Sequence, residues 1–104
     1  MTAKVDTLSS KIDDIKRTLQ SGNTEQAISL SKQVLDKHQD NIDALYFLTV
    51  AQRAKGLLAE ATKTVTQLIA LAPDHSRAHQ EDGYLKLSAN DKPGAATAFA
   101  KAVR

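Results

Sequence analysis

The strongest constraint on the fold is a repeat of fixed length. Ala27, Ala61 and Ala95 recur at one constant spacing, twice in succession, and each is followed by an apolar run with helical spacing. Five positions before each alanine stands a residue suited to a turn, and these residues are Gly22, Gly56 and Asn90. A period of about 34 residues is typical of a stacked array of helix-turn-helix units.

Apolar residues spaced three and four apart predict six helices and no strand. The first helix carries the stripe Val5, Leu8, Ile12, Ile15 and Leu19, and the second follows Asn23 and ends near His38. We expect the third helix at residues 43–55 and the fourth at residues 58–71. The fifth helix should extend to about residue 88 and the sixth to residue 103. The connections are short, so neighbouring helices should be antiparallel.

Turn and cap residues divide these helices. Gly22 and Gly56 can adopt the left-handed conformation that ends a helix, and Asn90 tolerates it best after glycine. Pro73 cannot continue a helix and marks a turn. Pro93 is suited to the first turn of the last helix, where the missing N–H is harmless.

Three helix starts carry recognisable capping residues. Asn23 can cap the second helix, with Gln26 as its capping-box partner. Asp74 or Ser76 can cap the fifth helix, and Asp91 can cap the sixth.

The composition is that of a soluble globular chain. It has 104 residues, a net charge of +2 and no cysteine, which excludes disulfides and thiolate metal sites. The charge is too balanced to indicate nucleic-acid binding. No stretch is long enough for a membrane span, and residues 1–15 lack the apolar core of a signal peptide, so a cytoplasmic location is expected.

The pattern resembles the tetratricopeptide repeat, whose unit has the same length of about 34 residues. Three units cover residues 8–41, 42–75 and 76–104, the last one truncated, and together form one domain. Position 20 is alanine in every unit, position 24 is Ser31, Val65 or Phe99, position 8 is Ile15, Thr49 or Gly83, and position 32 is Gln39 or Pro73. Only Gly83 and Pro73 fit the family at positions 8 and 32, so the first unit is degenerate and is expected to act as the N-terminal cap.

The resemblance implies an all-α fold, a right-handed solenoid of three units and about six antiparallel helices. The alanine has a steric role, because a larger side chain would force the two helices of a unit apart. Two alternatives are a helical bundle with coincidental alanines and a 35-residue RNA-binding repeat. The phase of the turn residues and the weak basicity of the chain count against them.

The first helix of each unit lines a concave groove in this family, and the groove binds peptides or helices of other proteins. Carried over position by position, the groove residues are Lys16, Tyr46, Phe47, Val50, Arg53, Arg77, Glu81, Tyr84 and Leu87. Tyrosine suits such a role because it offers a large contact area with a polar tip. The other reading of Tyr46 and Tyr84 is that they only cover the rim of the core.

No catalytic or cofactor-binding arrangement is recognisable. His75 and His79 have the spacing of metal ligands on a helix, but we interpret them as a turn residue and a packing residue. The chain is therefore predicted to be a non-catalytic protein-interaction module, without cofactor, metal, nucleic-acid or membrane partner. As an alternative, residues 78–84, followed by residues 96–104, are similar to the tetratricopeptide segment at the front of some bacterial sulfotransferases. This similarity covers roughly the last two units and would make the chain an N-terminal accessory domain of a larger enzyme.

The sixth helix is apolar around most of its circumference. Ala96, Ala100 and Val103 would face water in an isolated monomer, and exposed apolar patches usually mark contacts. We expect either a further helix beyond residue 104 or a homodimer that covers this patch.

Overall fold

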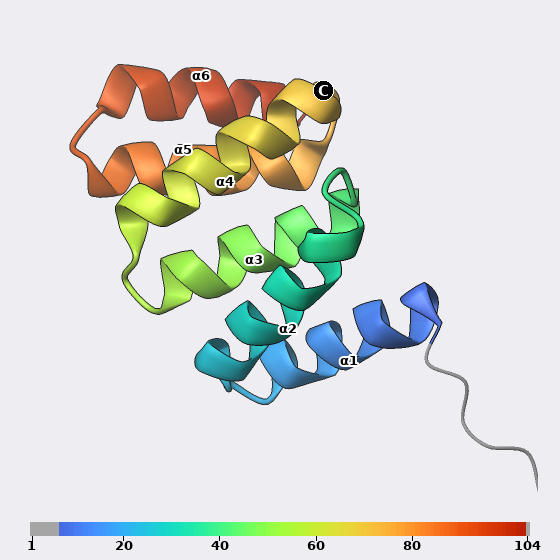
Figure 1. The fold of residues 1–104 in the computed structure, drawn as a ribbon. Coiled ribbons are helices and arrows are strands. Elements are labelled where there is room, and N and C mark those ends of the chain that lie inside the picture. Colours follow the sequence, from blue (N-terminus) through green and yellow to red (C-terminus); the bar gives the residue numbers. More distant parts are fainter. Residues whose placement is uncertain (1–6, 104) are drawn as a thin grey trace, which may run out of the picture.

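Six α-helices account for most of residues 7–103, the part of the chain that the computed structural model describes (Figure 1). No strand is present within this range. The helices are α1 (Leu8–Gln20), α2 (Thr24–Lys37), α3 (Ile42–Ala54), α4 (Leu58–Leu71), α5 (Ser76–Ser88) and α6 (Lys92–Ala102). Their bounds agree with the sequence prediction to within a few residues, while Val5 lies outside the described residues.

Consecutive helices pack in pairs, and the pairs stack into an elongated array with extents of 56 × 25 × 21 Å (Figure 1). The first helices of neighbouring units also meet, because Cα atoms of α1 and α3, and of α3 and α5, come within 8 Å of one another. In the described part of the chain, no Cα atom of α2 comes that close to α4, nor does any of α4 to α6. The stack therefore curves with α1, α3 and α5 on its inner side, and we call this side the inner face.

The turns inside the three units have the predicted backbone. Gly22 and Gly56 have φ angles of 86° and 87°, and Asn90 has a φ of 61°. This left-handed conformation is strained for most residues, which explains why glycine or asparagine recurs once in every unit. The prediction for these three positions is confirmed.

The caps agree with the prediction only in part. Asn23 and Asp91 accept the expected backbone N–H groups of Gln26 and Gly94. The Gln26 side chain, however, accepts from the Asn23 side-chain amide instead of the Asn23 backbone, so the capping box is incomplete. The prediction for α5 is wrong, because neither Asp74 nor Ser76 caps this helix.

His75 caps α5 through its imidazole. Its Nδ1 atom accepts the Ala78 N–H at 3.1 Å. Thr7 and Asn41 hold the same repeat position and cap α1 and α3 in the same way. Histidine escaped the prediction because it is not among the usual capping residues, although the period of the repeat points to this position.

The core follows the predicted phase of the repeat. Ala27 and Ala61 are completely buried and Ala95 is 1% exposed, as close helix crossings require. One cluster of buried side chains joins the last two units, with Leu45, Ala61, Val65, Leu68, Ala78 and Leu85 as members. A second cluster joins the first two units around Ile15, Val34 and Ala44.

The size of the residue at position 8 varies inversely with that at position 24. A Cβ atom on Gly83 would lie 2.5 Å from Cε1 of Phe99, so this ring packs directly on the backbone of α5. At the equivalent positions the first unit combines a large Ile15 with a small Ser31, both fully buried. The Ser31 hydroxyl has no hydrogen-bond partner within the described residues. Each unit thus fills the space at its helix crossing, and the units differ in how that space is shared between the side chains at positions 8 and 24.

Substitution of Ala61 by leucine should lower the free energy of unfolding by roughly 1–3 kcal/mol, because the added side chain overpacks the crossing of α3 and α4. Thermal and urea denaturation measure the loss. Ala59→Leu is the matched control, since Ala59 is exposed on the same helix. Equal stability of the two variants would contradict the close crossing at Ala61.

Replacement of His75 tests the imidazole cap. His75→Ala should lower the free energy of unfolding by about 1 kcal/mol, the usual effect of losing a cap. His75→Asn should retain most of it, because asparagine is the cap at the equivalent Asn41. Equal losses in both variants, measured by urea denaturation at neutral pH, would show that the hydrogen bond to Ala78 is unimportant.

Candidate functional site

All nine residues predicted to line the groove lie on the first helices of the units. Lys16 is on α1, Tyr46, Phe47, Val50 and Arg53 are on α3, and Arg77, Glu81, Tyr84 and Leu87 are on α5. The side chains differ in accessibility. Four are exposed, namely Lys16, Arg77, Tyr84 and Leu87, and those of α3 are half-buried. Glu81 is buried, so its carboxylate serves contacts within the protein.

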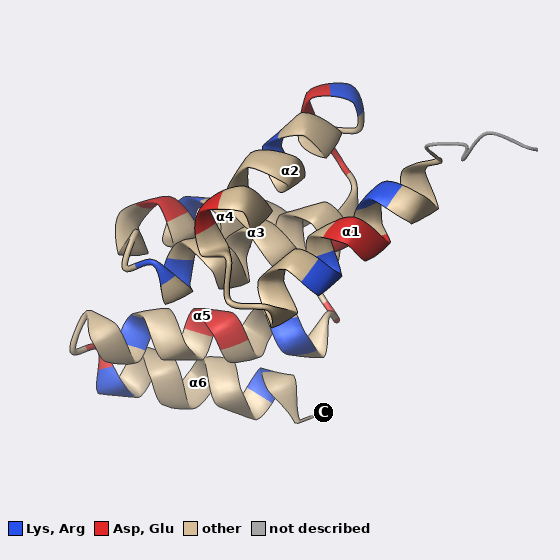
Figure 2. Cartoon of the chain, turned by 90° about the horizontal axis from the view of Figure 1, so that it is seen from below, with Lys and Arg blue, Asp and Glu red and all other residues tan. Residues whose placement is uncertain are grey.

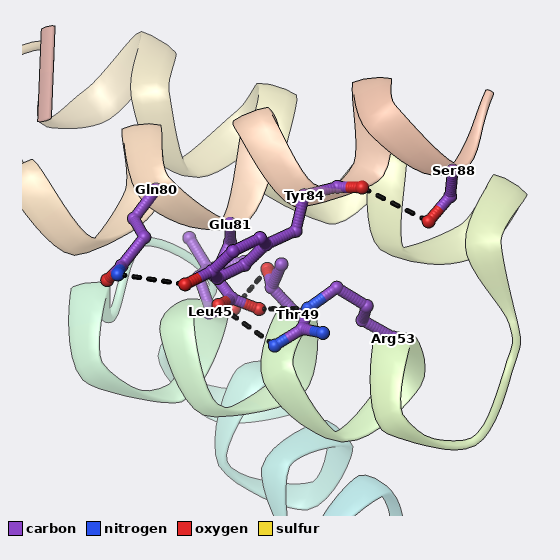
Figure 3. A network of polar contacts seen from close by, with 7 residues as sticks. All are labelled: Leu45, Thr49, Arg53, Gln80, Glu81, Tyr84 and Ser88. Carbon is purple, nitrogen blue, oxygen red and sulfur yellow. Dashed lines mark hydrogen bonds and ion pairs between the residues drawn. The ribbon is translucent and has the colours of Figure 1, made fainter. Parts of the chain in front are cut away.

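Arg53 and Glu81 form a two-pronged ion pair across the interface between the second and third units (Figure 3). Arg53 Nε donates to Glu81 Oε1 at 2.7 Å, and Nη2 donates to Oε2 at 3.2 Å. The Glu81 side chain is 6% exposed and that of Arg53 is 32% exposed. The hydrogen bond to Glu81 raises the pKa of the Arg53 guanidinium above its usual value. The pair connects α3 to α5, and each of its two charges compensates the other.

Tyr84 is fixed by three different neighbours. The guanidinium carbon of Arg53 lies 4.7 Å from the centre of its ring. Its hydroxyl accepts a hydrogen bond of 3.1 Å from Gln80 Nε2 (Figure 3). The ring also meets Phe99 of α6 edge to face, with 5.4 Å between the centroids. Although Tyr84 is 36% exposed, its orientation is thus determined before any partner arrives.

A second aromatic group lies nearer the start of α5. The rings of Tyr46 and His75 stack with 5.6 Å between their centroids, and Phe47 lies 5.5 Å from Tyr46. Burial raises the pKa of the Tyr46 hydroxyl, and the negative charge of Glu81 raises it further. The positive charges of Arg77 and Arg53 oppose this shift more weakly. Tyr46 therefore stays neutral and can act as a hydrogen-bonding group at physiological pH.

Sequence reasoning missed two contributors to this site. The sequence pattern predicts only a repeat position for Phe99, yet its ring supports Tyr84 from the second helix of the same unit. It predicts only a turn residue at His75, yet this side chain both caps α5 and stacks on Tyr46. The signal for both is the register of the repeat, which places them next to groove positions once the helices are paired.

Other ion pairs lie on the surface and have less influence. Lys55 contacts Glu25 at 2.6 Å, and this hydrogen bond lowers the pKa of the exposed carboxylate. Asp14 pairs with Arg17 on α1. Basic and acidic residues are interspersed over the helices (Figure 2), in keeping with the balanced net charge.

Two surface depressions lie away from the inner face. One of about 400 Å³ lies between α1 and α2 and is lined by charged residues such as Lys11, Asp14 and Lys37 together with the apolar Leu30 and Val34. The other, of about 410 Å³, includes His79 and Lys101. His79 Nε2 lies 2.6 Å from the Pro73 carbonyl oxygen, so this nitrogen is occupied.

Among residues 7–103, no group of three or more histidine, cysteine, aspartate and glutamate side chains is arranged to hold a metal ion. None of the helices in that range has the length and hydrophobicity needed to cross a membrane.

The Arg53–Glu81 pair can be tested by a double-mutant cycle. Arg53→Leu should lower the free energy of unfolding by about 2–3 kcal/mol, because it leaves the buried Glu81 carboxylate without a compensating charge. This loss is smaller than that expected for a fully buried pair, because Arg53 is partly exposed. Adding Glu81→Phe should restore most of the stability. Leucine and phenylalanine are the residues at the equivalent positions Leu19 and Phe47.

Urea denaturation of the four proteins in the cycle measures the coupling between the two side chains. If Arg53→Leu alone left the free energy of unfolding unchanged, the buried Glu81 carboxylate would not need the Arg53 charge for its stability. That result would contradict the structural role assigned to the pair.

Comparison with solved structures places this geometry among known folds. The type III secretion translocator chaperone SycD of Yersinia enterocolitica superposes with a TM-score of 0.87 at 16% identity, over 95% of this chain and 75% of its own. MamA of Desulfovibrio magneticus RS-1, residues 41 to the end, superposes with a TM-score of 0.84 at 18% identity, over 94% of this chain and 55% of its own. At these identities the likeness shows the fold alone.

Sequence comparison identifies the family. No curated protein sequence matches the chain significantly. The similarity to sulfotransferase-associated repeats therefore stays a prediction. The sequence profile of the tetratricopeptide repeat matches residues 18–80, more than half of the 104 residues. The chain belongs to the tetratricopeptide repeat family.

Proposed function

We propose that this chain is a non-catalytic, cytoplasmic protein-interaction module, and that its inner face binds an extended peptide or a helix of another protein. Residues 1–104 would form the binding domain, with the three units acting together. The observation that carries the proposal is the arrangement around Tyr84. An exposed aromatic ring whose position is fixed in advance costs little entropy on binding and is typical of residues that dominate interface energetics.

The surroundings of Tyr84 indicate the kind of segment that would bind. Half-buried Phe47 and Val50 on α3 and exposed Leu87 on α5 offer further apolar contact area on first helices of the units. Lys16 and Arg77 are exposed, and within residues 7–103 no carboxylate lies within salt-bridge distance of either. A ligand with an apolar anchor residue and flanking acidic residues would complement this surface.

The family and fold support an interaction function of this class. Repeat arrays present an extended curved surface made of one helix from each unit, which suits the recognition of a long segment. SycD, a structural neighbour, is a type III secretion translocator chaperone. It forms a dimer in that structure, and self-association of this chain stays among the proposals.

Tyr84→Ala should weaken binding of inner-face ligands about tenfold or more, as expected for a central aromatic anchor. Peptides selected from a random display library against the native chain serve as probes, and fluorescence polarisation measures their affinity. Leu71→Ala is the matched control, since Leu71 is exposed on α4 and lies outside the inner face.

Circular dichroism and thermal melts must show that both variants keep the fold. Selected peptides that bind both variants as tightly as the native chain would refute a role for Tyr84. Peptides that lose affinity only with Leu71→Ala would place the binding surface on the second helices.

A further inference from the structure

Arg77 carries a charge that the fold alone does not explain. It is the second residue of α5, where the partial positive charge of the helix terminus disfavours a cation. The first turns of α2, α3 and α4 each contain an acidic residue, whereas the first turn of α5 contains none. Arg77 is exposed, and among residues 7–103 no carboxylate lies within salt-bridge distance of it. Its charge is therefore available to a ligand.

Arg77 acts on the junction between the second and third units. Burial raises the pKa of Tyr46 on α3, and the positive charge of Arg77 opposes this shift, so the guanidinium lies close enough to the Tyr46 hydroxyl to affect it. The other two charges that act on this hydroxyl, those of Arg53 and Glu81, compensate each other. Two arginines and one glutamate thus leave one positive charge uncompensated, which is that of Arg77.

Arg77 and Tyr84 lie on the same face of α5. They are seven positions apart, which is close to two helical turns, and the helix rises about 10 Å between them. Gln80 lies between them on this face and donates a hydrogen bond to the Tyr84 hydroxyl (Figure 3). An extended peptide rises about 3.3 Å per residue, so about three residues span the same distance. A ligand that places an apolar anchor on Tyr84 can therefore place the residue three positions away on Arg77.

The other two first helices lack this combination. The equivalent residues are Asp43 and Val50 on α3, and Ser9 and Lys16 on α1. Asp43 is exposed and would repel an acidic residue of the ligand. Of the three first helices, α5 alone offers a cation and an exposed aromatic ring at this spacing, so the charge pattern favours one position of the ligand on the inner face.

We propose that Arg77 is the specificity-determining residue of the inner face, and that it binds an aspartate or glutamate three positions from the apolar anchor of an extended ligand. This role rests on the function proposed above, because it requires that the ligand contacts Tyr84. A guanidinium binds a carboxylate through two parallel hydrogen bonds, and the neutral Tyr46 hydroxyl can donate a third. The bound carboxylate would also offset the unfavourable position of Arg77 at the start of α5.

Selection of a random peptide display library against two forms of the chain tests this role. Peptides selected on the native chain should carry aspartate or glutamate three positions from an apolar residue. Peptides selected on Arg77→Glu should carry lysine or arginine at that position instead. A purely structural role of Arg77 would not reverse the charge of the selected residue.

The affinity of a selected acidic peptide, measured by fluorescence polarisation, gives the size of the effect. Arg77→Glu should weaken binding about tenfold or more, and lysine in place of the acidic residue of the peptide should restore most of the affinity for this variant. Lys63→Glu is the matched control, because Lys63 is exposed on α4 and this variant changes the net charge by the same amount. It should change the affinity less than about twofold, since salt screens distant charges.

Thermal melts show whether the variants keep the fold, and Arg77→Gln, which should bind acidic and neutral peptides equally, replaces Arg77→Glu if the latter unfolds. Equal affinity of an acidic peptide for the native chain and for Arg77→Glu would overturn the role of Arg77. Peptides that depend on Tyr84 but carry no acidic residue at a constant distance from their apolar residue would also overturn it, and the proposed function would stand. If no selected peptide depended on Tyr84, the proposed function would fail and the role of Arg77 with it.

Discussion

The close approach of two helices at one alanine in each unit is the contact on which the rest of the structure depends. Ala27, Ala61 and Ala95 are at most 1% exposed, and the side chains around them fill the space between paired helices. Because each pair has the same crossing, each presents the same kind of surface to the next pair. The stacking of first helices on the inner side, and with it the position of Tyr84, follows from that geometry.

The fold was largely predictable because its determinants are local and periodic. Gly22, Gly56 and Asn90 recur in the left-handed conformation, and the apolar stripes mark the helices directly. The cap of α5 was not predictable from local preference. Its imidazole acts as an acceptor only in the tautomer or charge state that leaves Nδ1 free, a property that composition does not reveal.

The candidate site was predictable as a set of positions and not as a set of interactions. The repeat register places Arg53, Glu81 and Tyr84 on first helices, and they lie there. Their mutual contacts depend on how α3 crosses α5, since Arg53 and Glu81 are 28 residues apart in the sequence. For the same reason a residue chosen as part of an open groove, Glu81, is buried under its partner.

The Arg53–Glu81 pair has a consequence for how cooperatively the chain unfolds. In a stack where each unit meets only its neighbours, stability is the sum of unit and interface contributions. Apolar clusters join both pairs of neighbouring units. The Arg53–Glu81 pair adds a largely buried polar link between the last two units, whereas the pair of Lys55 and Glu25, which links the first two units, lies at the surface. The first unit also contains the buried Ser31 hydroxyl, which has no hydrogen-bond partner among residues 7–103. Backbone amides of α1 and α2 should therefore exchange with solvent through local opening, while those of α3, α4 and α5 open together.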